Sequence, residues 1–202
     1  MTTLRDRKRE RTRKALVEAA TELFETRGYD ETTVADIAAA AEIGTRTFFG
    51  YFASKEEVLF PEADARVAAA VAAIANRTPG ETPVDVLLRT FRDLGTDADE
   101  MVGRTAALRL RLTLTIPAVR GRGLQIQLEA QREIARHLHE AFPGELDAVD
   151  AGALVGAFVG ATAGALYVIL EEPGVFDGDP AVLRGRLEAA MNTALRPWGD
   201  RA

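Results

Sequence analysis

The sequence predicts an all-α protein: a three-helix N-terminal domain containing a helix-turn-helix, then a C-terminal bundle of about six helices. Three observations support this fold class. In most segments apolar residues recur three and four positions apart, the period of a helix with one buried face. Proline and glycine stand between these segments, where they begin or end helices. Residues 101–116 alternate as in a strand, but they have no partner segment elsewhere, so a helix is favoured there too.

The composition bounds the size and the chemistry of the protein. Its 202 residues, 47% of them hydrophobic, are enough for two modest domains, which we expect at residues 1–53 and 54–202. The absence of cysteine excludes disulfides, thiolate metal sites and a cysteine nucleophile. The N-terminus does not resemble a signal peptide, so we expect a cytoplasmic protein.

The charge is unevenly distributed along the chain. The net charge is −6, yet residues 1–14 hold seven Lys and Arg against only Asp6 and Glu10. A basic arm on an acidic body suits local contact with phosphates, because the body repels DNA and limits unspecific binding. The alternative is a solvated, disordered tail.

The first helix is expected at residues 9–27, followed by Gly28 as its stop signal. The second helix begins at Thr33, whose hydroxyl forms a capping box with Asp36. After a turn at residues 42–44, a third short helix covers residues 45–52. The apolar residues of this unit include Leu16, Leu23, Phe24, Val34, Ile37, Ala38, Ala41, Ile43, Phe48 and Phe52.

The third helix leaves a hydrogen-bonding face uncovered. Thr45, Arg46, Thr47 and Tyr51 carry short or forked polar groups, which suit a helix lying in the major groove of DNA. Arg13, at the basic start of the first helix, is expected to flank the same groove. A short helix-turn-helix is also a common scaffold element, so the spacing alone does not decide between the two interpretations.

Six further helices are predicted after the third. Ser54 is expected to cap the next one, where the first-turn N–H groups and Lys55 form a site suited to a phosphate. The six helices cover residues 54–75, with a bend at Pro61, and residues 82–94, 101–116, 117–142, 147–172 and 180–195.

The helix at residues 147–172 contains glycines four positions apart, at Gly152, Gly156, Gly160 and Gly164. Each glycine costs about 1 kcal/mol in a helix interior, which predicts that another helix packs closely against this edge, in the same or a second subunit. The apolar run at residues 148–170 is long enough to span a membrane, but a helix buried in protein is the favoured interpretation.

In their order and spacing, these motifs resemble the TetR family of bacterial transcriptional regulators. The resemblance covers about residues 9–60. It rests on Leu-Phe in the first helix, Gly28-Tyr29, the Thr-Thr-Val-x-x-Ile-Ala segment, the Thr-Phe-Phe-x-Tyr-Phe segment and Ser-Lys-Glu at residues 54–56. Residues 61–202 fit only the family's helical architecture.

The resemblance implies the DNA-contacting residues. Thr33, Tyr51 and Lys55 would bind backbone phosphates, and Thr45, Arg46 and Thr47 would face the groove. Three residues depart from the family pattern. Glu42 replaces the usual turn glycine, Phe49 replaces a tyrosine that donates to phosphate, and Gly50 replaces a larger, often basic residue.

The resemblance also implies a homodimer formed by the last two long helices, and a small-molecule pocket among the central helices. Packing of the glycine edge within one subunit is the alternative. The expected dimer residues are Gly152, Gly156, Gly160, Gly164, Leu187 and Met191. A hydrophobic or amphipathic effector is expected at Arg104, Arg109, Arg111, Phe91 and Phe158, although such arginines are more often solvated.

No catalytic constellation is found in the sequence. His137 and His139 are two positions apart and point away from each other on a helix, so they cannot share a metal ion. We therefore expect no enzyme activity, cofactor or metal site. The predicted function is that of a ligand-responsive repressor that binds a palindromic double-stranded operator as a homodimer, with no membrane partner. The alternative is a helical small-molecule-binding or scaffold protein whose reading head, the helix-turn-helix, does not bind DNA.

Overall fold

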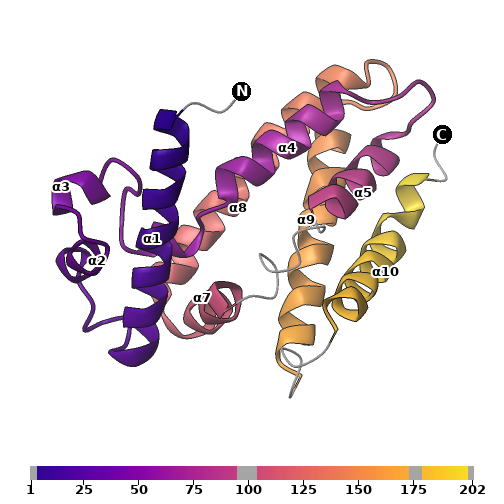
Figure 1. Cartoon of the computed structure of the whole chain (residues 1–202). Coiled ribbons are helices and arrows are strands. Elements are labelled where there is room, and N and C mark those ends of the chain that lie inside the picture. Colours follow the sequence, from indigo (N-terminus) through magenta and orange to yellow (C-terminus); the bar gives the residue numbers. More distant parts are fainter. Residues whose placement is uncertain (1–3, 95–103, 173–178, 200–202) are drawn as a thin grey trace. The chain divides into compact units, whose positions relative to one another are not determined.

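The computed structural model describes residues 4–94, 104–172 and 179–199. Within these residues it contains helices and turns and no strand, which confirms the all-α prediction. The chain divides into two compact units (Figure 1). Unit 1 comprises Met1–Glu62 and Arg104–Leu124, and unit 2 comprises Ala63–Gly103 and Gln125–Ala202. The division by compactness thus falls at Glu62, whereas the functional boundary predicted at residue 53 stays a prediction.

Unit 1 begins with three helices. They are α1 (Leu4–Thr26), α2 (Val34–Ala40) and α3 (Thr45–Phe48), and Figure 1 shows α2 beside both α1 and α3. α1 starts five residues earlier than predicted. α3 is shorter than predicted, because residues 49–51 continue the chain as turns before Phe52.

The turns of this unit follow from local signals in the sequence. Thr33 caps α2 in the predicted box: its hydroxyl accepts from the Asp36 N–H at 3.2 Å, and its own N–H donates to the Asp36 carboxylate at 2.9 Å. Gly28 adopts a φ of 93° after α1. Glu42 stands in the turn before α3 with a φ of 56°, so a non-glycine residue takes the left-handed conformation there.

The helix predicted at residues 54–75 is wrong as a single helix. A short 3-10 helix, η1 (Glu56–Leu59), is followed by a break, and α4 (Ala63–Ala75) begins only after Pro61. Proline has no N–H to donate and fixes its own φ, so it interrupts the helix instead of bending it. Ser54 does not cap η1, although the Glu57 carboxylate does accept from the Ala53 N–H.

The segment with strand-like alternation is a helix, α7 (Arg104–Thr115), as predicted. Residues 101–103 lie outside the described residues. Pro117 opens α8 (Pro117–Ala141), whose first turns belong to unit 1 and whose remainder belongs to unit 2. The core of unit 1 joins α1, α2, α3, η1, α7 and the start of α8 through Leu16, Phe24, Ile37, Phe48, Phe52, Leu59, Leu108, Leu112 and Val119.

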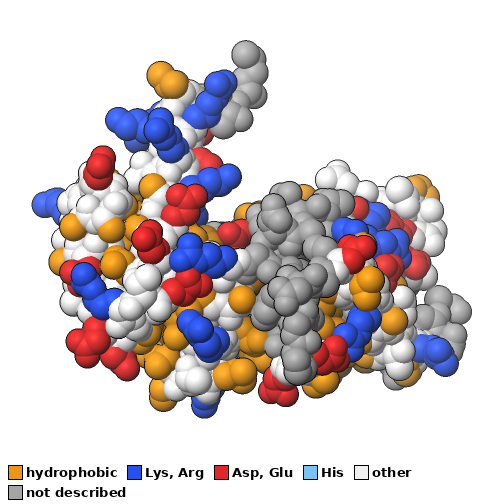
Figure 2. Space-filling view, turned by 60° about the horizontal axis from the view of Figure 1, so that its bottom comes forward, with side chains coloured by type: hydrophobic (Ala, Val, Ile, Leu, Met, Phe, Trp, Pro, Cys, Tyr) orange, Lys and Arg blue, Asp and Glu red, His pale blue; other side chains and the backbone are white. Residues whose placement is uncertain are grey.

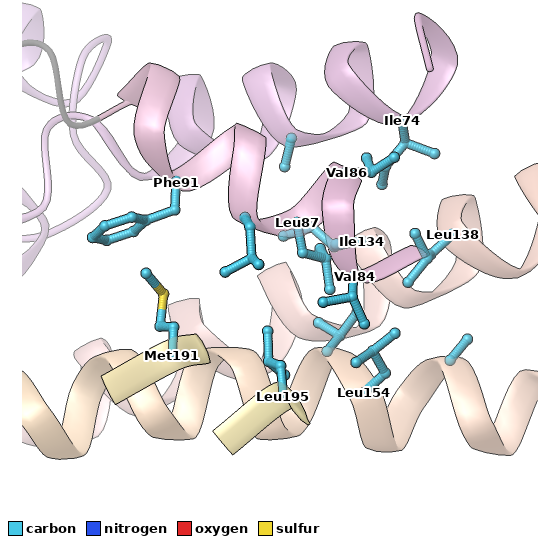
Figure 3. Packing of buried hydrophobic residues seen from close by; sticks show 14 of the residues in the cluster. Ile74, Val84, Val86, Leu87, Phe91, Ile134, Leu138, Leu154, Met191 and Leu195 are labelled. Carbon is cyan, nitrogen blue, oxygen red and sulfur yellow. The ribbon is translucent and has the colours of Figure 1, made fainter. Parts of the chain in front are cut away.

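Unit 2 contains α4, α5 (Pro83–Leu94), most of α8, α9 (Ala148–Leu170) and α10 (Pro180–Gly199). Together with α7 they are the six helices that follow the reading head in the described part of the chain. A capping box between Thr82 and Asp85 begins α5. In the core Met191 of α10 points toward Phe91 of α5 (Figure 3).

α9 is unusual because much of its apolar surface lies uncovered. Residues Ala148–Ile169 have a mean hydropathy of 1.8, and only 17% of this stretch is buried within the chain. By length and composition alone the helix is able to cross a membrane, which is weak evidence, because core helices of soluble proteins meet the same criterion. Among the described residues the helix predicted to be buried is buried only in part, through core residues such as Leu154, Val155 and Ile169.

Candidate nucleic-acid interface

α3 separates a buried from an exposed face. Phe48 and Phe52 are 0% and 1% exposed and fill the core of unit 1. Thr45, Arg46 and Thr47 are exposed, as predicted for the polar face. The carbonyl of Gly44 accepts from the N–H groups of Thr47 and Phe48, so α3 starts tightly against the turn. The result is a short helix anchored by two aromatic rings, with hydroxyl and guanidinium groups directed outward.

The start of α1 carries the basic arm. Lys and Arg side chains gather at this end of the helix in the space-filling view (Figure 2). Arg5, Arg7, Lys8, Arg9, Arg11 and Lys14 are exposed, whereas Arg13 is half-buried. Most of the arm is therefore available to bind anions.

Arg13 is held inside unit 1 by three contacts. Its guanidinium donates to the carbonyls of Tyr51 at 3.4 Å and Pro61 at 2.5 Å. Its central carbon lies 4.6 Å from the centre of the Phe52 ring, a cation–π contact. One turn earlier, Arg9 donates to the Gly50 carbonyl at 3.4 Å. Arg9 and Arg13 thus bind carbonyls in the turn after α3, and Arg13 also binds the Pro61 carbonyl after η1.

Lys55 is also engaged within the chain. Its ammonium group donates to the carbonyls of Tyr29 at 2.8 Å and Thr32 at 2.9 Å. The Tyr29 hydroxyl donates to the carboxylate of Glu56, and burial together with this hydrogen bond raises the pKa of Tyr29. Lys55 and Glu56 thus fasten the turn between α1 and α2 to η1.

Thr33 precedes α2 and Tyr51 follows α3, so they lie at the two ends of the helix-turn-helix. Thr33 is exposed, and its hydroxyl is shared with Asp36, whose carboxylate also pairs with Arg27 at 3.2 Å. The hydrogen bonds from Thr33, and then the Arg27 charge, lower the pKa of Asp36. Tyr51 is half-buried, and the Arg9 guanidinium lies 5.4 Å from the centre of its ring.

The structure adds a support that the sequence analysis did not find. α7 and the start of α8 contact α1 and η1, which flank the helix-turn-helix, through polar pairs within unit 1. Arg122 donates to Glu57 at 2.7 Å, and Glu57 in turn accepts from the Ala53 N–H just after α3. Arg109 donates to the Leu59 carbonyl at 3.2 Å, and Arg104 pairs with Glu25. These partners are 50 to 79 residues apart in the chain, so no local signal identifies them.

The residues predicted for the effector site are not brought together within one unit. Arg104, Arg109 and Arg111 belong to unit 1, where Arg104 and Arg109 make the contacts just described. Phe91 is a core residue of unit 2, and Phe158 is packed against the same core. A cleft of about 440 Å³ in unit 2 is lined by other residues: Thr82, Pro83, Val84, Gly144, Glu145, Leu146, Asp150, Leu154 and Trp198.

The residues predicted for a dimer interface divide into two groups. In the described part of the chain nothing lies within 4 Å of a Cβ added to Gly152, Gly156, Gly160 or Gly164. The close packing predicted for this edge is therefore not made by the described residues. Leu187 and Met191 are both 0% exposed and belong to the core of unit 2, so they are not available to a partner.

Among the described residues, no group of three or more His, Cys, Asp and Glu is placed to hold a metal ion. His137 pairs with Glu133 at 3.0 Å on the same face of α8, and His139 contacts the Leu146 carbonyl at 2.9 Å. Both contacts are local to α8 and the turn that follows it.

Comparisons with known proteins agree with this geometry. The family described as bacterial regulatory proteins, tetR family, matches residues 16–60, the segment from the middle of α1 to the end of η1. The HTH-type transcriptional regulator TcmR of Streptomyces glaucescens is 41% identical over 138 residues, which cover 66% of this chain and 61% of TcmR. The matched region thus spans about three fifths of the length of this curated relative.

Solved structures share the fold. FadR of Thermus thermophilus, a TetR family transcriptional repressor in complex with lauroyl-CoA, has a TM-score of 0.55 at 24% identity and covers 91% of this chain and 93% of FadR. The SmeT–triclosan complex has a TM-score of 0.58 at 21% identity, covering 92% of this chain and 90% of SmeT. Sequence motif, helical fold and helix-turn-helix geometry agree: residues 16–60 match the tetR family of bacterial regulatory proteins, and the chain is similar to the regulator TcmR.

Proposed function

We propose that this protein is a ligand-responsive transcriptional repressor that binds a palindromic DNA operator as a homodimer. The observation that carries this proposal is the exposed face of α3, where Thr45, Arg46 and Thr47 project from a helix held by the buried Phe48 and Phe52. Such groups match the base-edge donors and acceptors of the major groove.

The described side chains take two kinds of role in this proposal. Thr45, Arg46 and Thr47 read base edges, and Thr33, Tyr51 and the exposed cations of α1 contact backbone phosphates. Arg13 and Lys55 are assigned as positioning residues, because each already donates two hydrogen bonds to backbone carbonyls within the chain. This assignment departs from the sequence prediction, which placed both of them on DNA.

The dimer is proposed to form through the glycine edge of α9. The four glycines lie on a helix of which only 17% is fully buried, and no described atom lies within 4 Å of a Cβ added to any of them. A second copy of α9 at this edge gains close helix packing and removes apolar area from water. A palindromic operator follows, because two reading heads related by a two-fold axis bind two inverted half-sites.

The effector is proposed to be a hydrophobic or amphipathic small molecule bound by unit 2. The support is indirect: FadR is described with lauroyl-CoA and SmeT with triclosan. A repressor of this kind acts on chromosomal DNA, so we place it in the cytoplasm, with α9 covered by protein and not by lipid.

The proposal is tested by selection from random DNA. The full-length protein is incubated with a library of random duplexes at several salt concentrations, and the bound duplexes are sequenced. An enriched inverted repeat supports the proposal. The absence of enrichment at every salt concentration would overturn it in favour of a helical small-molecule-binding or scaffold protein.

A further inference from the structure

Phe49 is an exposed aromatic side chain on the proposed reading head. It follows the last residue of α3, and 55% of it is exposed, whereas the neighbouring Phe48 is fully buried. Contact of this apolar surface with water is unfavourable relative to burial. An uncovered ring on a proposed binding face therefore calls for a partner that covers it.

The direction of the Phe49 ring is set by the backbone and by Phe48. The Phe49 N–H donates to the Thr45 carbonyl at 3.3 Å, and its φ and ψ of −66° and −8° keep it near helical geometry. The two rings meet edge to face, with centroids 5.5 Å apart and planes at 85°. Phe48 thus supports Phe49 from the core side of unit 1.

Phe49 shares its helix face with the proposed base readers. Residues three and four positions apart lie on one side of a helix, so Phe49 follows Arg46 and Thr45 on that side. Gly50, the next residue, carries no side chain to cover the ring, and a Cβ added there would lie 3.2 Å from the Thr47 carbonyl oxygen. The ring therefore extends the polar face by an apolar patch.

The chemistry of the ring restricts what it binds in DNA. Phenylalanine has no hydroxyl and cannot donate to a phosphate. In the major groove the apolar group on a base edge is the C5 methyl of a pyrimidine, which unmodified DNA carries only on thymine. We propose that Phe49 is a specificity-determining residue that contacts thymine C5 methyl groups in each half-site, an inference that rests on the proposed DNA-binding function.

The experiment removes only the methyl groups. An operator is first obtained by selection from random duplexes with the full-length protein, and each thymine is then replaced in turn by deoxyuridine. Wild-type protein should lose roughly fourfold in affinity for each methyl group that Phe49 contacts, as expected from burial of one such carbon. Phe49→Ala should bind the thymine operator more weakly and should not distinguish thymine from deoxyuridine at those positions.

Leu114→Ala serves as the matched control, because Leu114 is 46% exposed on α7, away from α3 in the chain. This variant should retain the thymine preference of wild type. Equal binding of all deoxyuridine operators by wild type, or an undiminished preference in Phe49→Ala, would overturn the inference while leaving DNA binding intact. Failure to select any operator would instead overturn the proposed function.

Discussion

The ammonium nitrogen of Lys55 lies 3.9 Å from the centre of the Tyr29 ring and donates a hydrogen bond to the carbonyl of that same residue. A second bond reaches the Thr32 carbonyl. Lys55, which follows the helix-turn-helix in the chain, therefore binds two carbonyls of the turn that precedes α2. The position of α2, and with it that of α3, depends on this contact.

Lys55→Ala should lower the free energy of unfolding by about 1.5–3 kcal/mol, because two carbonyls lose a charged donor. The salt dependence of DNA binding should stay unchanged. Both are measured with one preparation, by urea denaturation and by operator titration at several salt concentrations. The exposed Lys14→Ala is the control: it should leave stability within about 0.5 kcal/mol of wild type and flatten the salt slope by about 0.9. Native stability with a flattened slope in Lys55→Ala would instead make Lys55 a phosphate ligand.

Arg13 and Arg11 lie two positions apart on α1 but should behave differently. Arg13→Ala should lower the melting temperature, because the carbonyls of Tyr51 and Pro61 and the Phe52 ring lose their partner. Arg13→Lys should not restore it, since an ammonium cannot donate as a planar fork while stacking on a ring. Arg11→Ala should keep the melting temperature and weaken binding to all DNA sequences. A reversed pattern would place Arg13 on phosphate.

Arg46→Ala should weaken binding to the selected operator by about 1–3 kcal/mol, if the guanidinium donates to a guanine edge. Binding to random DNA should change much less, because base contacts carry the sequence preference. The measurement compares dissociation constants for operator and random duplexes at one salt concentration. Equal losses on both would show that Arg46 contacts the backbone only.

Gly160→Leu tests the proposed dimer. The exposed Gly160 has no described neighbour within 4 Å of an added Cβ, so the single chain should accept leucine and keep its helix content. A second copy of α9 packed at this edge should be displaced, giving a monomer in analytical ultracentrifugation. Gly121→Leu on α8, equally open, is the control and should remain dimeric. A wild-type protein that is monomeric and partitions into lipid vesicles would favour a membrane role for α9.

The Glu81–Arg89 pair should make stability depend on acid. The Arg89 guanidinium donates to the Glu81 carboxylate at 2.6 Å, and the Thr78 N–H donates to the same carboxylate. These hydrogen bonds lower the pKa of Glu81 to about 2, from an ordinary value of 4.5. Because the folded pKa is the lower one, the pair stabilises the fold above about pH 4.5 and loses this contribution as the pH falls toward 2. Glu81→Gln should therefore be less stable than wild type at pH 7, and the difference should shrink between pH 4.5 and 2. Glu31→Gln, an exposed carboxylate, controls for the loss of one charge, and a constant difference across this range would contradict the assignment.

Local signals carried the predictions that held. The capping box of Thr33 and Asp36 joins residues three positions apart, so the sequence displays it completely. The sequence also shows Pro61 as a helix-disrupting residue. Whether it bends or breaks the helix depends on the packing of the segments on either side, which the local sequence does not specify.

The sequence predictions and the structure differ where contacts join distant segments. Arg13 and Lys55 were assigned to DNA because a cation near a reading helix suits phosphate, yet their acceptors are carbonyls 23 to 48 residues away. Leu187 and Met191 lie on an apolar stripe of α10. Its periodicity indicates that the stripe is buried, but it does not indicate whether the same chain or a second subunit covers it. Burial within unit 2 answers that question for these two residues, and the open glycine edge of α9 is the remaining part of the predicted interface.

The left-handed backbone conformation of Glu42 affects how much conformational entropy the helix-turn-helix loses on binding. An L-residue in this conformation costs roughly 1–2 kcal/mol that glycine would not incur, so the strain is borne permanently by the folded turn. In return the turn samples fewer backbone geometries than a glycine turn would. Less conformational entropy is then lost when α3 enters the groove. Glu42 thus exchanges folding stability for preorganisation, a way to compensate for a recognition helix with few side chains able to contact phosphate.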